Sequence, residues 1–354
     1  VLAALEAVAP AARAASWDPV GLQVGDPDAA VRRAAVAHEL TPAVVDRLIA
    51  DPVDLVVAYH PLLFRPTTSF VAGGGASGRA YRLAAAGIGV AVAHTNFDVA
   101  PGGAADALAD ALGLEEIEGF GPLWGRESVR IVAFVPDEAA DSVADAMAAS
   151  GAGTVGAYTG CSFRSTGTGV FTAAPHSDPA AGRAGATHRE PETRVEMSAP
   201  AARADAVVAA LVAAHPYEEP VYDVLDRRGD AGFVGRVGSA GAGSTVEDLA
   251  ALVSDRLGGV VRVAGTGAVR RVAVVPGSGA DFADAARSAG ADVIVTGDVR
   301  HHAAAAAIER GLAVVDPGHA PTEGPGVERL YAAVAAEVPE TRDLTESPDP
   351  WRPA

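Results

Sequence analysis

The chain has 354 residues, 49% of them hydrophobic, and its 45 acidic and 27 basic residues give a net charge of −18. This length predicts two or three domains, and an acidic chain without a basic stripe disfavours duplex nucleic acid as a partner. The single cysteine, Cys161, excludes an internal disulfide and a cysteine-rich metal site. No apolar run approaches the roughly 18 residues of a membrane span, and the first residues lack the pattern of a signal peptide. The sequence therefore predicts a soluble cytoplasmic protein.

The first part of the chain reads as a helix followed by a connector. Residues 1–16 have apolar side chains at helical spacing, with an interruption at Pro10. The next stretch, residues 16–25, reads SWDPVGLQVG and is rich in turn-forming residues. We interpret it as a connector between a helix and a strand, with Trp17 packed as an anchor.

Strands and helices alternate after this connector. Residues 31–39 read as a strand, 41–50 as a helix and 53–58 as a strand. Thr41 is suited to cap the helix, with a proline in its first turn. The run at 53–58, apolar except for Asp54, and the apolar run at 88–93 are typical of strands buried on both faces of a parallel sheet.

The character of the sequence changes near residue 125. Residues 126–230 follow a strand–helix–strand rhythm twice, which predicts a ferredoxin-like α+β domain, and the polar segment Ser177–Glu192 is predicted to be a loop. The earlier α/β style then resumes, with a helix predicted over Val246–Leu257. The predicted domains are the first half of an α/β core (1–125), an inserted domain (126–230) and the second half of the core (231–354).

The two outer segments resemble each other. When residues 31–60 are set beside 269–298 without gaps, eight of the thirty positions are identical: 31, 32, 33, 35, 36, 46, 54 and 57 in the first copy. The match also preserves the order of the predicted elements. It predicts two pseudo-symmetric halves that form one α/β core around the inserted domain.

The stretch Gly311–Glu323, GLAVVDPGHAPTE, combines a strand with a candidate metal site. Its apolar run is followed by a Pro-Gly stop. If the chain then turns helical, His319 and Glu323 share one face, one turn apart. The first half has the same pattern in His94 and Asp98. An imidazole and a carboxylate so placed suit a divalent metal, although a solvated pair is the alternative.

Four polar residues lie just past apolar runs: His60, Asp98, Asp298 and His319. In open α/β sheets, ligands bind at the carboxyl ends of strands. Burial of several such groups without a partner or a metal would be costly. We therefore predict a metal centre there; the alternative is that these residues cap helices and pair with each other.

Together these segments resemble the Nif-three-like proteins, also called GTP cyclohydrolase I type 2 homologues. The resemblance rests on SWDPVGLQVG, DLVVAYHPLLFRP, VAHTNFDVAPGG, VRRVAVVPGSG, VIVTGDVRHH and VVDPGHAPTE, which in this order span almost the whole chain. The middle region is similar to the insert of the longer bacterial members, which resembles the trimeric PII and CutA domains. The resemblance implies a dinuclear metal centre and a toroidal homohexamer.

The resemblance also implies a set of metal ligands. His60 matches the second histidine of the family's His-His-Pro motif, and Asp98 matches the carboxylate of its His-Thr-Asn-x-Asp segment. His319 and Glu323 match the final ligand pair, in which Glu323 is placed to bridge two ions.

Tyr59 departs from this pattern, because many members have the first histidine there. A tyrosine could bind as phenolate, but its reference pKa of about 10 makes it a reluctant ligand. The second metal position is therefore open: Tyr59, His94 or water could complete it. Mixed nitrogen and oxygen ligation does not choose among Zn, Fe, Mn and Mg.

These residues favour a metal-dependent hydrolase that acts on a nucleotide-like or phosphorylated small molecule, with His94 as the candidate proton donor. Two alternatives stay open: a metal store or carrier, and a regulatory assembly without turnover.

Three further motifs have structural alternatives. The Pro276–Gly279 turn could hold a phosphate at a helix N-terminus or be a plain turn. His301 and His302 read as a surface pair. His215, with Glu218 and Glu219 between prolines, reads as a shaped turn.

Overall fold

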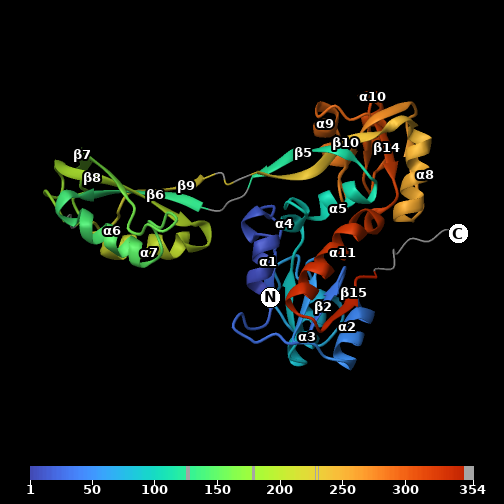
Figure 1. Ribbon diagram of the computed structural model, residues 1–354. Helices are drawn as coiled ribbons and strands as arrows, with labels where there is room; N and C mark the ends of the chain where they lie inside the picture. The colour runs from blue at the N-terminus through green and yellow to red at the C-terminus, as the bar shows by residue number, and fades with distance from the viewer. Residues whose placement is uncertain (125–127, 178–179, 228, 230, 347–354) are drawn as a thin grey trace. The chain divides into compact units, whose positions relative to one another are not determined.

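The computed structural model describes residues 1–124, 128–177, 180–227, 229 and 231–346. The chain divides into two compact units (Figure 1). We call Val1–Leu123 together with Ala231–Ala354 the core unit, and Trp124–Asp230 the middle unit. Both units combine helices with sheets, so the chain has a mixed α/β fold, as predicted. Within the described residues, no helix has the length and apolarity needed to cross a membrane.

The first sheet of the core unit has five strands in the order β1-β4-β3-β2-β15. Strands β2, β3, β4 and β15 run parallel, and β1 pairs antiparallel with β4. Its strands are β1 (Gly21–Val24), β2 (Ala34–Ala37), β3 (Leu55–Ala58), β4 (Gly89–Val92) and β15 (Thr341–Leu344).

Side chains of β3 and β4 are buried on both faces of the sheet, as their apolar runs predicted, and those of β2 are buried in the same way. Residues that alternate along β2 and β3 belong to two separate cores. One core includes α2 (Pro42–Ala50) and α3 (Gly75–Ala85), and the other includes α1 (Leu2–Val8) and α11 (His319–Glu337). The predicted cap of α2 is present: Thr41 Oγ1 accepts a hydrogen bond from Val44 N at 3.3 Å.

The second sheet has six strands in the order β11-β14-β13-β12-β10-β5. Strands β12, β13 and β14 run parallel, and β11 pairs antiparallel with β14. Its strands are β5 (Glu115–Trp124), β10 (Ala231–Thr245), β11 (Arg262–Ala264), β12 (Ala268–Val274), β13 (Val293–Val295) and β14 (Ala313–Asp316). Its helices are α5 (Ala104–Ala111), α8 (Val246–Leu257), α9 (Ala283–Ser288) and α10 (His301–Glu309).

Helix α11 belongs to both parts of the core unit. It begins at His319, three residues after β14 ends, and its Val327, Leu330 and Val334 pack against the first sheet. Figure 1 shows this helix, in red, running from the second sheet to the first. A Cβ on Gly326 would lie 2.5 Å from the Cβ of Ala104, so this glycine allows α11 to approach α5 closely.

The middle unit has one antiparallel sheet in the order β7-β8-β6-β9. Its elements are β6 (Ser128–Pro136), α6 (Ala140–Ala149), β7 (Phe163–Thr172), β8 (Thr187–Pro200), α7 (Ala204–Ala214) and β9 (Tyr222–Arg227), and both helices share one core with the sheet. The prediction of a loop through Glu192 was wrong at its end. Residues 187–192 extend β8, because β7 pairs with them from Thr172 to Gly167.

His215 has a structural role in the middle unit, as its flanking prolines predicted. Its Nε2 lies 3.0 Å from the carbonyl oxygen of Phe134, and its Nδ1 accepts a hydrogen bond from Tyr217 N at 3.1 Å. Both ring nitrogens therefore form hydrogen bonds with backbone groups. Burial lowers the pKa of His215, which keeps the ring neutral.

The packing of α11 predicts that Leu330→Ala lowers the free energy of unfolding by about 2 to 5 kcal/mol, the usual cost of a buried Leu→Ala change. Leu330 is fully buried between α11 and the first sheet. Urea unfolding would measure the loss. Glu328→Ala, at an exposed position on the same helix, should change little, and equal losses in both variants would contradict this packing.

The neutral state of His215 predicts a stability that falls with acid. Its folded pKa lies below the unfolded value of about 6.5, so the unfolded chain takes up the proton first as pH drops through that value. His215→Gln should therefore reduce the fall in Tm between pH 7.5 and 5.5, measured by calorimetry. The exposed His176→Gln should keep the wild-type fall, and an unchanged fall in His215→Gln would argue against a neutral, buried ring.

Candidate metal centre

The candidate centre lies where the parallel strands of the first sheet end. His38 directly follows β2, Tyr59 and His60 follow β3, and His94 lies two residues after β4. Because these strands are parallel, their carboxyl ends lie along one edge of the sheet. The first two turns of α11 bring Glu323 to the same place.

Glu323 is the central residue of this group. Its side chain is 4% exposed, and three imidazoles contact its two oxygens. His38 Nε2 and His60 Nε2 lie 2.7 and 3.1 Å from Oε2, and His319 Nε2 lies 3.0 Å from Oε1. The ligand atoms of His38, His60 and Glu323 lie within 4.8 Å of one another.

These contacts set the charges of the group. Burial alone would raise the pKa of Glu323, but hydrogen bonds with His319, His38 and His60 outweigh it and hold that pKa well below its ordinary value. The same carboxylate is the main cause that raises the pKa of His319 to about 9, with Asp298 adding to the effect against burial. Glu323 is therefore a buried carboxylate anion, and it needs cationic partners.

The donor set fits a divalent ion. Imidazole nitrogen and carboxylate oxygen suit Zn, Fe and Mn. Two ligand atoms that each lie about 2.1 Å from one ion are roughly 3.0 to 3.4 Å apart at octahedral or tetrahedral angles. The distance of 3.1 Å between His60 Nε2 and Glu323 Oε2 matches this spacing, and the 2.7 Å between His38 Nε2 and the same oxygen is a hydrogen-bond length that would have to widen slightly around an ion. His38, His60 and Glu323 therefore form a group that could hold a metal ion.

Asp298 orients His319. Its Oδ2 lies 2.7 Å from His319 Nδ1, which directs Nε2 to Glu323, the usual arrangement of a carboxylate behind a ligand histidine. Asp298 has a positive φ of 56°, a strained conformation that aspartate tolerates better than most residues. Asp298 thus joins the cluster, as its place after a strand predicted, in a supporting position.

The buried Tyr59 and the half-buried Asp98 form a separate pair. The Tyr59 hydroxyl donates a hydrogen bond to Asp98 Oδ1. Burial, followed by the charges of Asp98 and Glu323, raises the pKa of Tyr59 well above its ordinary value, so this side chain is a phenol. Burial also raises the pKa of Asp98 to about 6, although His94 opposes it.

His94 is held by Asp18. His94 Nδ1 lies 3.0 Å from Asp18 Oδ2, and the same oxygen accepts a hydrogen bond from Thr95 N at 3.0 Å. Burial would lower the pKa of His94, but Asp18 and the nearby charges of Asp98 and Glu323 raise it. The ring of His94 lies 5.4 Å from that of His60, so His94 borders the candidate metal group.

Sequence reasoning did not single out His38 or Asp18. His38 had the same signal as the others, since it directly follows an apolar strand. Asp18 lies in the stretch interpreted as a connector, and nothing local marked it. The expectation that Trp17 packs as an anchor was wrong: its side chain is 59% exposed, with its ring 5.8 Å from that of Phe64 and 6.4 Å from that of His94.

The Pro276–Gly279 turn supports α11. The amides of Gly277 and Gly279 donate to the hydroxyls of Thr322 and Thr296 at 2.9 and 2.8 Å, so both are occupied and do not serve a phosphate. A Cβ on Gly277 would lie 2.6 Å from Glu323 Oε1, and φ there is +61°. Glycine at 277 therefore leaves room for the carboxylate.

The histidines at the start of α10 fit the surface pair that the sequence favoured. His301 and His302 are exposed, and their rings lie 5.2 Å apart.

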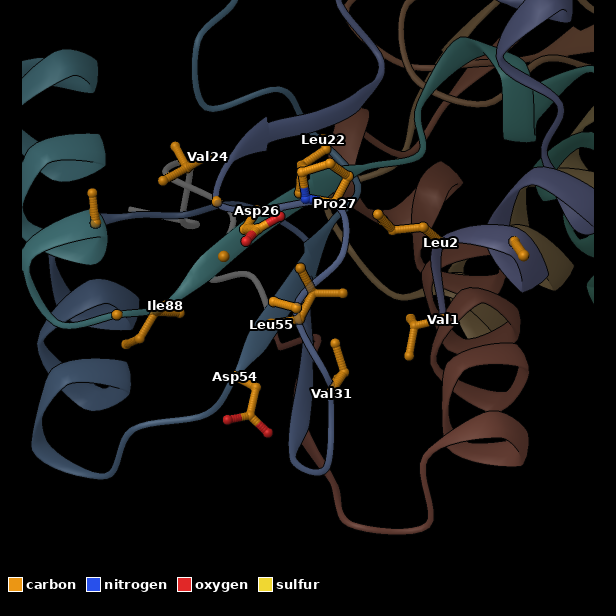
Figure 2. Close-up of a pocket in the computed structure, with 16 residues that line it drawn as sticks. Val1, Leu2, Leu22, Val24, Asp26, Pro27, Val31, Asp54, Leu55 and Ile88 are labelled. Carbon is orange, nitrogen blue, oxygen red and sulfur yellow. The ribbon is translucent and has the colours of Figure 1, made fainter.

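A cavity of about 510 Å³ lies at the opposite end of the first sheet (Figure 2). Leu55 and Ile88, which line it, lie at the amino ends of β3 and β4, whereas Tyr59 and His94 follow their carboxyl ends. Asp54 also lines it, and its Oδ2 accepts hydrogen bonds from the amides of Arg32 and Arg33. The cavity is therefore distinct from the metal group.

Comparison with known proteins places the chain in a family. Residues 1–348 match the family model described as Duf34/NIF3 (NGG1p interacting factor 3). A relative from Halalkalibacterium halodurans named "GTP cyclohydrolase 1 type 2 homolog" is 36% identical over 325 residues, which cover 90% of this chain and 87% of the relative. A relative of the same name from Mycobacterium bovis is 36% identical over 364 residues, covering 99% and 95%.

Comparison with solved structures points to the same family. A Bacillus cereus protein related to NIF3 aligns with a TM-score of 0.64 at 34% identity, covering 99% of this chain and 97% of that one. A Staphylococcus aureus protein aligns with a TM-score of 0.65 at 26% identity, covering 100% and 97%. The match over nearly the whole chain, together with the histidine and carboxylate cluster at the strand ends, shows that this chain belongs to the Duf34/NIF3 family.

Proposed function

We propose that this chain is a metal-dependent hydrolase that acts on a nucleotide-like or phosphorylated small molecule through a mono- or dinuclear divalent metal centre. One observation carries the proposal: three imidazoles from separate segments converge on the two oxygens of the buried Glu323. The name of the relatives, GTP cyclohydrolase 1 type 2 homolog, supports a nucleotide-like substrate.

The proposed ligands are His60, Asp98, His319 and Glu323, with Tyr59 or another side chain completing the set. A divalent ion at this position would supply Lewis-acid chemistry by polarising the group that water attacks. His60 contacts one oxygen of the Glu323 carboxylate and His319 the other, so these three side chains would hold the one or two ions of the centre.

His94 is the proposed general acid. Asp18 binds its Nδ1 and fixes the ring, so Nε2 is the atom that would carry or release the proton. Asp18 and the other nearby carboxylates favour the protonated ring, which could donate to a leaving group. A protein that only stores or carries metal would not need a histidine oriented by an aspartate beside the ions. We therefore prefer the hydrolase to metal storage or delivery.

The proposal includes the finer architecture. We infer that residues 1–125 and 231–354 are pseudo-symmetric halves, and that 126–230 is an inserted ferredoxin-like domain. The strand orders β1-β4-β3-β2 and β11-β14-β13-β12 support the first inference, since each has one antiparallel edge and three parallel strands. The order β6-α6-β7-β8-α7-β9 supports the second. The toroidal homohexamer implied by the family resemblance remains part of this proposal.

An aromatic surface beside His94 supports a substrate with a planar ring. Trp17 and Phe64 are 59% and 48% exposed, and Trp17 contacts both Phe64 and His94. Aromatic side chains bind the flat faces of bases by stacking. A nucleotide whose phosphate or ring atom lies near His94 could therefore place its base on Trp17.

Glu323→Gln tests the metal centre. The change keeps the size of the side chain but removes the charge that three imidazoles contact. We expect the purified variant to lose most of its bound Zn, Fe or Mn by elemental analysis, and to lose hydrolysis of nucleotides and phosphoesters by product chromatography.

His302→Gln is the matched control, because His302 is exposed on α10 and should keep wild-type metal content. Full metal content in Glu323→Gln would refute the site. Bound metal without turnover on any substrate of the panel would instead favour storage or regulation.

Trp17→Ala tests the aromatic surface. Stacking of a base is worth about 1 to 3 kcal/mol, so KM for a nucleotide should rise roughly five- to hundredfold. Hydrolysis of a small phosphoester without a ring should change little. Tyr158→Ala, at a 75% exposed aromatic residue of the middle unit, is the control. An equal effect on both substrates would rule out stacking.

A further inference from the structure

We propose that His38, not Tyr59, is the metal ligand that completes the set of His60, Asp98, His319 and Glu323. Tyr59 is then a positioning residue that holds Asp98. The inference rests on the metal centre of the proposed function. It gives two neighbouring positions distinct roles, with His38 in place of Tyr59 as the proposed ligand.

His38 has the geometry of a ligand. Its side chain is 5% exposed, and its Nε2 lies 2.7 Å from Glu323 Oε2, closer than His60 Nε2 at 3.1 Å. The rings of His38 and His60 lie 4.9 Å apart. Two ring nitrogens thus converge on one carboxylate oxygen, and an ion can take the place of the protons that lie between these atoms.

The Tyr59 hydroxyl already has a hydrogen-bond partner. Its hydroxyl donates to Asp98 Oδ1, and its side chain is fully buried. To bind an ion as phenolate, it would have to lose both that proton and that hydrogen bond. His38 Nε2 would also give up its contact with Glu323, but an imidazole can keep its proton on Nδ1 and bind an ion through Nε2 while it stays neutral, which a phenol cannot do.

The hydrogen bond of Tyr59 has its own use. Asp98 lies in the four-residue helix α4 (Thr95–Asp98), which follows His94. The phenol holds Oδ1 of this half-buried carboxylate, which leaves Oδ2 as the oxygen that could bind an ion. Tyr59 would therefore act through Asp98 and would not touch the metal.

Positions 38 and 59 lie side by side, so a ligand side chain at either one could reach the same ion. They follow the paired ends of β2 and β3, where Ala37 lies opposite Ala58, and Tyr59 N donates to the carbonyl of Ala37 at 2.9 Å. The rings of His38 and Tyr59 lie 5.6 Å apart, with Tyr59 5.4 Å from His60. An imidazole introduced at position 59 could thus reach the ion that His38 serves.

Four variants test this inference through metal binding, independently of turnover: His38→Ala, Tyr59→Phe, the double variant His38→Ala/Tyr59→His, and the control His302→Ala. Zn²⁺ affinity would be measured by competition with a chromophoric chelator, and Co²⁺ loading would be followed by its visible spectrum. Circular dichroism and Tm would show that each variant is folded.

We expect His38→Ala to weaken binding of at least one ion about tenfold or more, the scale on which metal sites respond to altered ligation. Its Co²⁺ spectrum should change. Tyr59→Phe should keep the wild-type ion count, and the double variant should regain the affinity lost in His38→Ala. Recovery in the double variant also excludes misfolding as the cause of the loss.

Wild-type Zn²⁺ affinity in a folded His38→Ala protein would overturn the inference, as would a loss in Tyr59→Phe that matches the loss in His38→Ala. These outcomes leave the hydrolase proposal standing. Wild-type protein that binds metal as inferred but turns over no substrate would reject the hydrolase alone. Protein that binds no divalent ion would reject both.

Discussion

The buried charge of Glu323 is the constraint on which this centre depends. A carboxylate that is 4% exposed cannot rely on water, so its oxygens require partners within the protein. His38, His60 and His319 meet this need from three different segments of the chain. The same negative charge, surrounded by imidazoles, is what would allow the group to hold a divalent cation. The stability of this part of the fold and the proposed metal binding thus depend on the same contacts.

Helix α11 brings this charge to the strand ends. Its first turns follow β14 of the second sheet, and its later turns pack on the first sheet through Val327 and Leu330. Two glycines leave the necessary room: Gly277 beside Glu323, and Gly326 beside α5. The two sheets therefore hold α11 in place, and the position of this helix determines where the Glu323 carboxylate lies.

The carboxylates around the centre have different tasks because their surroundings differ. Asp298 is half exposed and orients His319, whereas Asp18 is buried and holds His94. Asp98 faces a phenol, and burial raises its pKa to about 6. Asp298 behind His319 and Asp18 behind His94 fix the orientations of these two rings, which would reduce the reorganisation that binding of an ion or substrate requires.

The sequence by itself determined the α/β class, most strand positions, the cap at Thr41, and the pairing of His319 with Glu323 one helical turn apart, because these follow from local periodicity and turn chemistry. It also indicated His60, Asp98 and Asp298 through their places after apolar runs. Only the tertiary structure decided that His38 contacts Glu323 across 285 positions, that Asp18 holds His94, and that Tyr59 donates to Asp98. Those contacts depend on which strand ends lie side by side and where α11 crosses them, and no local pattern encodes either.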